Sequence, residues 1–169
     1  LDTEGDQIIE IGAQKWHNGK VLATFESFVK PTMELTPEIT TITGITDEML
    51  TDQPQIEEVL PKFLQFIKDT ILVAHNAEFD MAMLRNTCLR QNITLSWPAF
   101  CTLKMARVFL SDLENKKLDT LAEHYGLSFE ARHRSVGDVK VTTDVLSAML
   151  SEHPDLKSWQ DFEPFKVHS

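Results

Sequence analysis

Residues 71–84, ILVAHNAEFDMAML, join a short apolar run to an apolar pattern with helical spacing, and a histidine and an asparagine separate the two. The run predicts a buried strand, and the pattern predicts a helix from residue 79 to residue 91. A strand that leads directly into a helix is typical of α/β proteins, in which ligands bind outside the carboxyl ends of the strands. Asp80 therefore becomes a candidate site residue if other chemically suited groups reach the same edge.

The remaining segments extend this α/β pattern. Two runs rich in β-branched and aromatic residues flank Asn18-Gly19, a strong turn dipeptide, and they predict a hairpin. We expect a mixed central sheet flanked by helices, with a main domain over residues 1–150. The last segment, 151–169, is predicted to be an irregular C-terminal extension that packs on the domain or leads to a linker. Residues 35–50 predict a short helix and a turn, and residues 97–102 a short strand or extended link. Helices are predicted at 56–67, with a kink at Pro61, and at 102–110 and 138–150, and a short helix in 117–127 should stop at Gly126.

The bulk composition limits the function classes. The 169 residues suit one domain with a sizeable core, and a net charge of −10 argues against unaided binding to nucleic acid. Acidic side chains gathered in one cleft can, however, bind divalent cations that reverse the local field. No apolar run is long enough to span a membrane, and no secretory signal is recognisable. Cys88 and Cys101 have no metal-ligand spacing, so we expect buried reduced thiols in a cytoplasmic protein.

Two carboxylates open the chain in the stretch LDTEG. Asp2 and Glu4 are two residues apart, so on a strand they point to the same face. Their charges repel unless a cation lies between them. The alternative interpretation is a solvent-facing strand edge, because short matches of this kind are common.

A histidine and a further carboxylate occur in ARHRSVGDVKV. His133 and Asp138 are five residues apart, which in a continuous helix places them roughly 140° apart, on different faces. We therefore expect His133 on a loop and Asp138 in the first turn of the next helix. The alternatives are a solvated loop histidine and an ordinary acidic residue at a helix N-terminus.

Together these segments supply four carboxylates: Asp2, Glu4, Asp80 and Asp138. Carboxylate oxygens suit Mg²⁺ or Mn²⁺. Four of them can hold two divalent ions about 3.5–4 Å apart, the arrangement used for in-line displacement at phosphorus. A nearby histidine such as His133 can deprotonate the attacking water, because its unperturbed pKa lies near neutrality.

The ordered set of motifs resembles the DEDDh group of 3′–5′ exonucleases, which includes the proofreading exonucleases of bacterial DNA polymerase III. The motifs in question are DTE, IIEIGA, TGIT, VAHNAEFD, CTLKMAR, KLDTLAEHYGL and HRSVGD. The resemblance implies a ribonuclease H-like fold and two metal ions held by Asp2, Glu4, Asp80 and Asp138. It implies that His133 is the general base, and that nucleoside 5′-monophosphates are released. It also implies that His75 and Asn76 shape the substrate pocket and that Ile45 and Thr46 lie beside the terminal nucleotide.

Two features depart from the family pattern. The family usually continues its D-x-E with Thr-Thr-Gly and several more residues, whereas here Gly5 and Asp6 lead straight into QIIEIGA. Only Leu1 precedes Asp2, although a central strand needs about five residues. We therefore expect the natural chain to have residues before Leu1 and further residues in the loop after Glu4.

The predicted function is metal-dependent 3′–5′ hydrolysis of single-stranded DNA ends in the bacterial cytoplasm, with a DNA polymerase or helicase as partner. Trimming of RNA 3′ ends is the nearest alternative, because the loops that would recognise a 2′-hydroxyl cannot be identified from the sequence. A non-catalytic domain that binds a polymerase, a helicase or nucleic acid is an alternative of another class. A metallophosphatase would usually have more histidines in ligand pairs.

Overall fold

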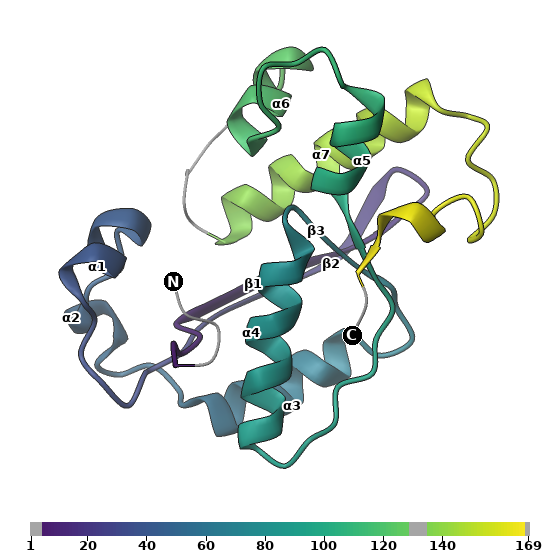
Figure 1. The fold of residues 1–169 in the computed structure, drawn as a ribbon. Helices are drawn as coiled ribbons and strands as arrows, with labels where there is room; N and C mark the ends of the chain where they lie inside the picture. Colours follow the sequence, from purple (N-terminus) through teal and green to yellow (C-terminus); the bar gives the residue numbers. More distant parts are fainter. Residues whose placement is uncertain (1–4, 129–134, 168–169) are drawn as a thin grey trace.

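The computed structural model describes residues 5–128 and 135–167, which form helices on both sides of an extended hairpin (Figure 1). The hairpin consists of β1 (Glu10–His17) and β2 (Lys20–Phe28), which pair antiparallel. Asn18 and Gly19 at its turn have φ values of 48° and 78°. A two-residue turn that matches the strand twist requires positive φ at both positions, and this explains the Asn-Gly pair. The predicted hairpin is confirmed.

A second sheet contains three short strands. β3 (Leu72–Ala74) pairs parallel with β4 (Ala99–Cys101), and β4 pairs antiparallel with β5 (Lys166–Val167). This sheet is mixed, as predicted. The prediction that β3 is buried is wrong for Val73, which is 40% exposed. Successive side chains of a strand point to opposite faces, and only Leu72 and Ala74 pack against the core.

The C-terminal segment is more ordered than the sequence predicts. A 3-10 turn, η1 (Glu163–Phe165), leads into β5, and both Phe165 and Val167 are buried. The prediction of an irregular segment is therefore wrong for these residues, because a two-residue strand depends on the partner edge that β4 offers. A domain boundary at residue 150 stays a prediction.

Seven α-helices lie among the described residues, and their ends follow capping chemistry. The Thr36 side chain accepts a hydrogen bond from the Ile39 amide at 3.3 Å, and Gly44 ends the same helix in the left-handed conformation. Gly126, with φ of 64°, follows the sixth helix, as predicted. The helices are α1 (Pro37–Thr43), α2 (Asp47–Leu50), α3 (Ile56–Phe66, with Pro61 inside it), α4 (Ala77–Arg90), α5 (Thr102–Phe109), α6 (Leu118–His124) and α7 (Ser135–Glu152).

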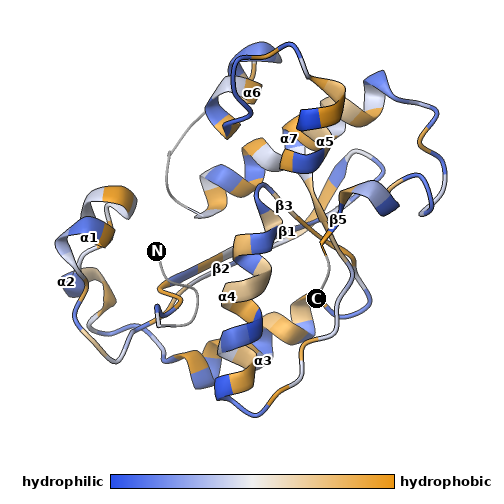
Figure 2. Cartoon of the chain, viewed as in Figure 1, coloured by the Kyte–Doolittle hydropathy of each residue, from blue (hydrophilic) through white to orange (hydrophobic). Residues whose placement is uncertain are grey.

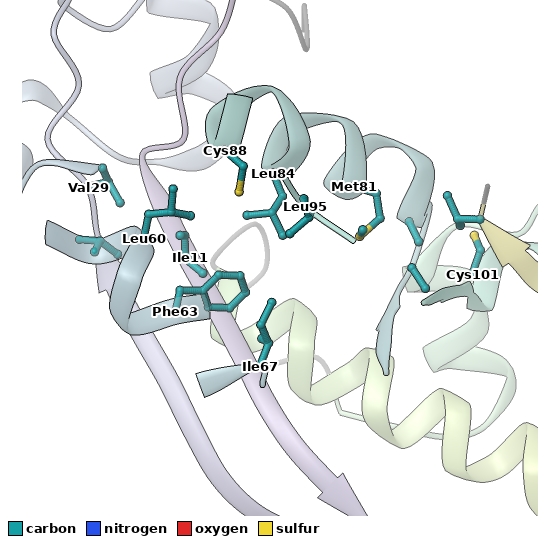
Figure 3. Close-up of a cluster of buried hydrophobic side chains, with 14 residues drawn as sticks. Ile11, Val29, Leu60, Phe63, Ile67, Met81, Leu84, Cys88, Leu95 and Cys101 are labelled. Carbon is teal, nitrogen blue, oxygen red and sulfur yellow. The ribbon is translucent and has the colours of Figure 1, made fainter. Parts of the chain in front are cut away.

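The hydrophobic core has two parts. In the first, Leu60 of α3 and Leu84 and Cys88 of α4 approach Ile11 of β1 from two sides (Figure 3). The second joins β4 and η1 to α5, α6 and α7, and hydrophobic and hydrophilic residues alternate along these helices (Figure 2). The two parts position the ends of α4 and α7, which carry two of the predicted carboxylates.

Both cysteines are free and buried, as the sequence predicts. None of the helices in the described ranges is long and apolar enough to cross a membrane.

Candidate active site

Asp80 and Asp138 are the two predicted carboxylates within the described residues. Each lies in the first turn of a helix, Asp80 in α4 and Asp138 in α7. Figure 1 shows the two helices beginning in the same region of the molecule, beside β3. The negative charge of Asp138 acts on the Asp80 carboxyl, so the two carboxylates lie near each other. The predicted position of Asp138 in the first turn of a helix is confirmed.

The protein around Asp80 raises the pKa of its carboxyl. Burial raises its pKa to about 6, and the charge of Asp138 adds to this rise, while a hydrogen bond to the Asp80 backbone amide opposes it. The residue is nevertheless exposed by surface area. Solvent thus reaches the side chain while the protein around it removes part of its hydration. This exposure reduces the electrostatic cost of the charge.

The two aspartates suit a divalent cation. Carboxylates that repel each other and have lost hydration are stabilised by a hard metal ion. Within residues 5–128 and 135–167, no group of three or more His, Cys, Asp or Glu side chains is placed to hold a metal. Asp80 and Asp138 would thus need additional ligands. The predicted ligands Asp2 and Glu4 lie outside the described residues, as does His133.

His75 is held by two hydrogen bonds. Its Nε2 donates to the Lys116 carbonyl oxygen at 2.8 Å, so Nδ1, which lies 2.9 Å from Thr102 Oγ1, accepts from that hydroxyl when the ring is neutral. Burial lowers the pKa of His75, and the positive charge of Arg107 lowers it further. The hydrogen bond to the Lys116 carbonyl acts in the opposite direction. A neutral, doubly hydrogen-bonded ring links the start of α4 to the segment before α6. His75 is therefore suited to shaping a pocket.

Asn76 forms the sharp corner between β3 and α4, with φ of 67°. It lines, with His75, an open hollow of about 590 Å³. We call this the basic hollow, because Arg107, Lys116 and Lys117 also line it. Its volume lies within the range of about 300–1,000 Å³ typical of ligand sites.

The two residues predicted beside a terminal nucleotide have structural contacts of their own. Ile45 is only 1% exposed. Thr46 caps α2, since its Oγ1 accepts a hydrogen bond from the Met49 amide at 3.4 Å. Their proposed contact with substrate stays a prediction, and the burial of Ile45 favours a role for its backbone.

β1 fixes the start of α7, and thereby Asp138. Glu10 and Gly12 point to the same face of the strand, since they are two residues apart. Glu10 Oε2 accepts a hydrogen bond at 3.1 Å from the backbone amide of Ser135, the first residue of α7. This contact satisfies one of the amides that a helix N-terminus leaves unpaired. A Cβ at Gly12 would lie 2.5 Å from Ser135 Oγ and 2.9 Å from the Ser135 carbonyl carbon.

We expect Gly12→Ala to destabilise the protein by about 1–3 kcal/mol, the usual cost of overpacking. The added methyl group must displace Ser135, and with it the first turn of α7. Urea denaturation followed by circular dichroism measures the loss. Gly12→Ala with Ser135→Gly is the matched control, and it should regain part of the stability because two of the three closest atoms belong to the serine side chain. A Gly12→Ala variant as stable as the parent would contradict the close approach of β1 to α7.

Sequence reasoning missed both Glu10 and the basic hollow. A charged residue within the apolar run IIEIGA was the available signal for Glu10. Arg107 and Lys117 are ten residues apart in different segments, and no local pattern predicts that they line one hollow.

Comparison with known proteins shows the family to which the chain belongs. The family model described as "Exonuclease" matches residues 1–146, most of the chain. This chain belongs to the exonuclease family. It is an exonuclease domain, and hence a hydrolytic nuclease, as the order of its motifs predicts. The family generally uses divalent metal ions, in agreement with the repulsion between Asp80 and Asp138.

Several relatives of this exonuclease domain are bacterial polymerases. The chain is 43% identical over 152 residues to a PolC-type DNA polymerase III of Caldanaerobacter subterraneus, with 90% of the chain and 11% of the polymerase aligned. It is 42% identical over 179 residues to the PolC-type polymerase of Thermotoga maritima, with 98% of the chain and 13% of the polymerase aligned. The chain thus spans only about an eighth or less of the length of these relatives.

Solved structures confirm the fold. Exonuclease X in complex with 5′-overhanging duplex DNA aligns with a TM-score of 0.78 at 24% identity, over 96% of this chain and 93% of that chain. The nuclease domain of 3′hExo, a DEDDh family member bound to rAMP, aligns with a TM-score of 0.77 at 20% identity, over 89% and 84% of the two chains. The predicted ribonuclease H-like exonuclease fold is therefore confirmed, as is the resemblance to DEDDh enzymes.

Proposed function

We propose that this exonuclease domain removes nucleotides from the 3′ ends of DNA, in proofreading or repair, within or beside a bacterial DNA polymerase in the cytoplasm. The observation that carries the proposal is the placement of Asp80 and Asp138 in the first turns of two converging helices, in a chain that belongs to the exonuclease family. The similarity of more than 40% to PolC-type polymerases supports DNA as substrate and a polymerase as partner.

In the proposed reaction, water attacks the terminal phosphodiester, the bond to the 3′ oxygen of the preceding nucleotide breaks, and a nucleoside 5′-monophosphate leaves. Asp80 and Asp138, with Asp2 and Glu4, would hold two ions, Mg²⁺ or Mn²⁺. These ions would supply electrostatic stabilisation of the charge that develops on the phosphoryl oxygens. His133 would take the proton of the attacking water. His75 and Asn76 would shape the pocket around the terminal nucleotide, with Ile45 and Thr46 beside it.

RNA is the competing substrate. A structural neighbour of the same fold is a 3′-exonuclease described as recognising a histone mRNA stem-loop, and it is 20% identical to this chain. That level of similarity reflects the fold alone. The greater identity to DNA polymerases therefore favours DNA, and a direct comparison of the two substrates is part of the test.

The test is hydrolysis of single-stranded DNA and RNA of one sequence, labelled at either the 5′ or the 3′ end. With Mn²⁺ or Mg²⁺ we expect the 5′-labelled DNA to shorten stepwise, and the 3′-labelled DNA to release a labelled mononucleotide at once. EDTA should stop both reactions. Stepwise shortening of 3′-labelled DNA would contradict the proposed direction, and faster cleavage of RNA than of DNA would contradict the proposed substrate. An RNA-trimming exonuclease would then be the better conclusion.

A further inference from the structure

The basic hollow contrasts with the rest of this chain. The exonuclease domain has a net charge of −10, so its average field repels a nucleic-acid strand. Three cationic residues, Arg107, Lys116 and Lys117, nevertheless line one hollow. No described residue of its lining is acidic. The nearby Glu78 forms an ion pair with Lys104 at 2.8 Å, and the charge of Arg107 also lowers the pKa of the Glu78 carboxyl.

The backbone around the hollow is held by hydrogen bonds. The Lys116 carbonyl accepts from His75, and the Lys117 amide donates to Asn115 Oδ1 at 3.0 Å. Lys116 Nζ donates a hydrogen bond to the Leu113 carbonyl at 2.6 Å, so this ammonium group already stabilises the loop before α6. Arg107 and Lys117 are both exposed at the hollow and are the cations best placed to meet a ligand.

The hollow adjoins the proposed catalytic carboxylates. Asn76 lines it and is the cap residue directly before α4, and Asp80 follows in the first turn of that helix. The rise from the cap to Asp80 is only about 6 Å along the helix axis. A ligand that occupies the hollow at Asn76 therefore has only a short distance to extend to reach Asp80.

We propose that the basic hollow binds the phosphate backbone of the nucleic-acid strand whose 3′ end reaches Asp80, through Arg107 and Lys117. This site deepens the proposed function and rests on it for the identity of the strand. Arginine and lysine donate charge-assisted hydrogen bonds to phosphate oxygens, and such contacts hold a strand without selecting its sequence. An acidic exonuclease domain gains from this arrangement, because a local cationic site offsets the repulsion of the whole chain.

The experiment measures binding of a fluorescein-labelled single-stranded DNA decamer by anisotropy, in EDTA and at several salt concentrations. Arg107→Gln with Lys117→Gln should weaken binding by about fivefold or more. It should also reduce the slope of log affinity against log salt by about 1.4, since each contact to a single strand contributes about 0.7. The matched control is Lys20→Gln with Lys62→Gln, which removes two exposed lysines from the hairpin and from α3. This control should change affinity by less than twofold.

Charge-conserving variants keep the test independent of folding. Arg107→Lys with Lys117→Arg should bind within about threefold of the parent, and thermal melts should show every variant folded. An unchanged affinity and salt slope in the double glutamine variant would overturn the proposal. An equal loss in the lysine control would overturn it as well, because it would show a diffuse charge effect.

A small substrate separates this site from the catalytic one. Thymidine 5′-monophosphate p-nitrophenyl ester has no neighbouring phosphates, so its rate of hydrolysis with Mn²⁺ reports the catalytic site alone. A loss of rate on this ester in the double glutamine variant as large as its loss of affinity for DNA would overturn the proposal. A parent protein that hydrolyses neither this ester nor an oligonucleotide would refute the proposed function. The binding measurement in EDTA would still decide whether the hollow holds a strand.

Discussion

Asp80→Asn is expected to lower the rate of DNA hydrolysis by about 10³-fold or more. The proposed ions supply several kcal/mol of transition-state stabilisation, and each 1.36 kcal/mol corresponds to about a factor of ten. Amide oxygen is a weaker ligand than carboxylate, so the site loses charge while its shape is kept. Single-turnover assays with Mn²⁺ measure the effect. Glu78→Gln is the matched control on the same helical turn, and its exposed ion pair with Lys104 should matter little.

The same substitution should not reduce the stability of the metal-free protein. Because the pKa of Asp80 is raised to about 6, the native state holds a proton that the unfolded chain releases near pH 4. The stability of the parent therefore falls as pH rises from about 4 to about 6 and remains lower above that range. We expect a contribution of about 1 kcal/mol or less, because the residue is exposed. The stability of the Asp80→Asn variant should not show this decline between about pH 4 and pH 6.

Thermal melts of the parent and the variant from pH 4 to pH 8, in EDTA and with millimolar Mn²⁺, test the ligand role separately from the chemistry. A free ligand at about a hundred times its dissociation constant stabilises the native state that binds it by about 2.7 kcal/mol. The parent should gain stability with Mn²⁺, and the variant should gain much less. Hydrolysis within twofold of the parent, or equal stabilisation of both proteins by Mn²⁺, would refute Asp80 as a ligand.

His133→Ala is expected to slow the chemical step by about 10²–10⁴-fold, the usual contribution of a positioned general base. Binding of Mn²⁺ and of DNA should change much less, because His133 is not among the four proposed ligands. The rise in rate with pH near neutrality should also flatten, since a histidine pKa lies in that range. Rates of mononucleotide release in single turnovers, measured across pH, give both results.

The control for this variant is His17→Ala, which removes an exposed histidine at the end of β1. It should leave both the rate and the pH profile unchanged. If His133 is instead a solvated loop residue, its variant will behave like the control. That result would exclude the DEDDh-type mechanism while leaving the metal ligands open.

Elements with strong local signals could be predicted from the sequence. Asn18-Gly19 predicted the hairpin, because few residue pairs tolerate two positive φ values in succession. Helical spacing predicted α3, α4 and α7, and the five-residue separation from His133 placed Asp138 in a first helical turn. The ordered motifs also predicted the exonuclease family, which the match over residues 1–146 confirms. Each of these inferences depends on residues that are close together in the chain or on their order.

Only the tertiary structure decided how distant segments meet. The hydrogen bond from the Ser135 amide to Glu10 joins residues 125 positions apart, and β5 forms only because β4 offers an edge. The raised pKa of Asp80 depends on the protein around it and on Asp138, and the basic hollow depends on the packing of α5 beside the segment before α6. Turn and helix propensities act over a few residues, whereas burial and charge act through space. The sequence by itself therefore determined the family, the local elements and the residues that we propose carry the chemistry. The packing of α4, α5 and α7 determined what surrounds those residues that the structure describes.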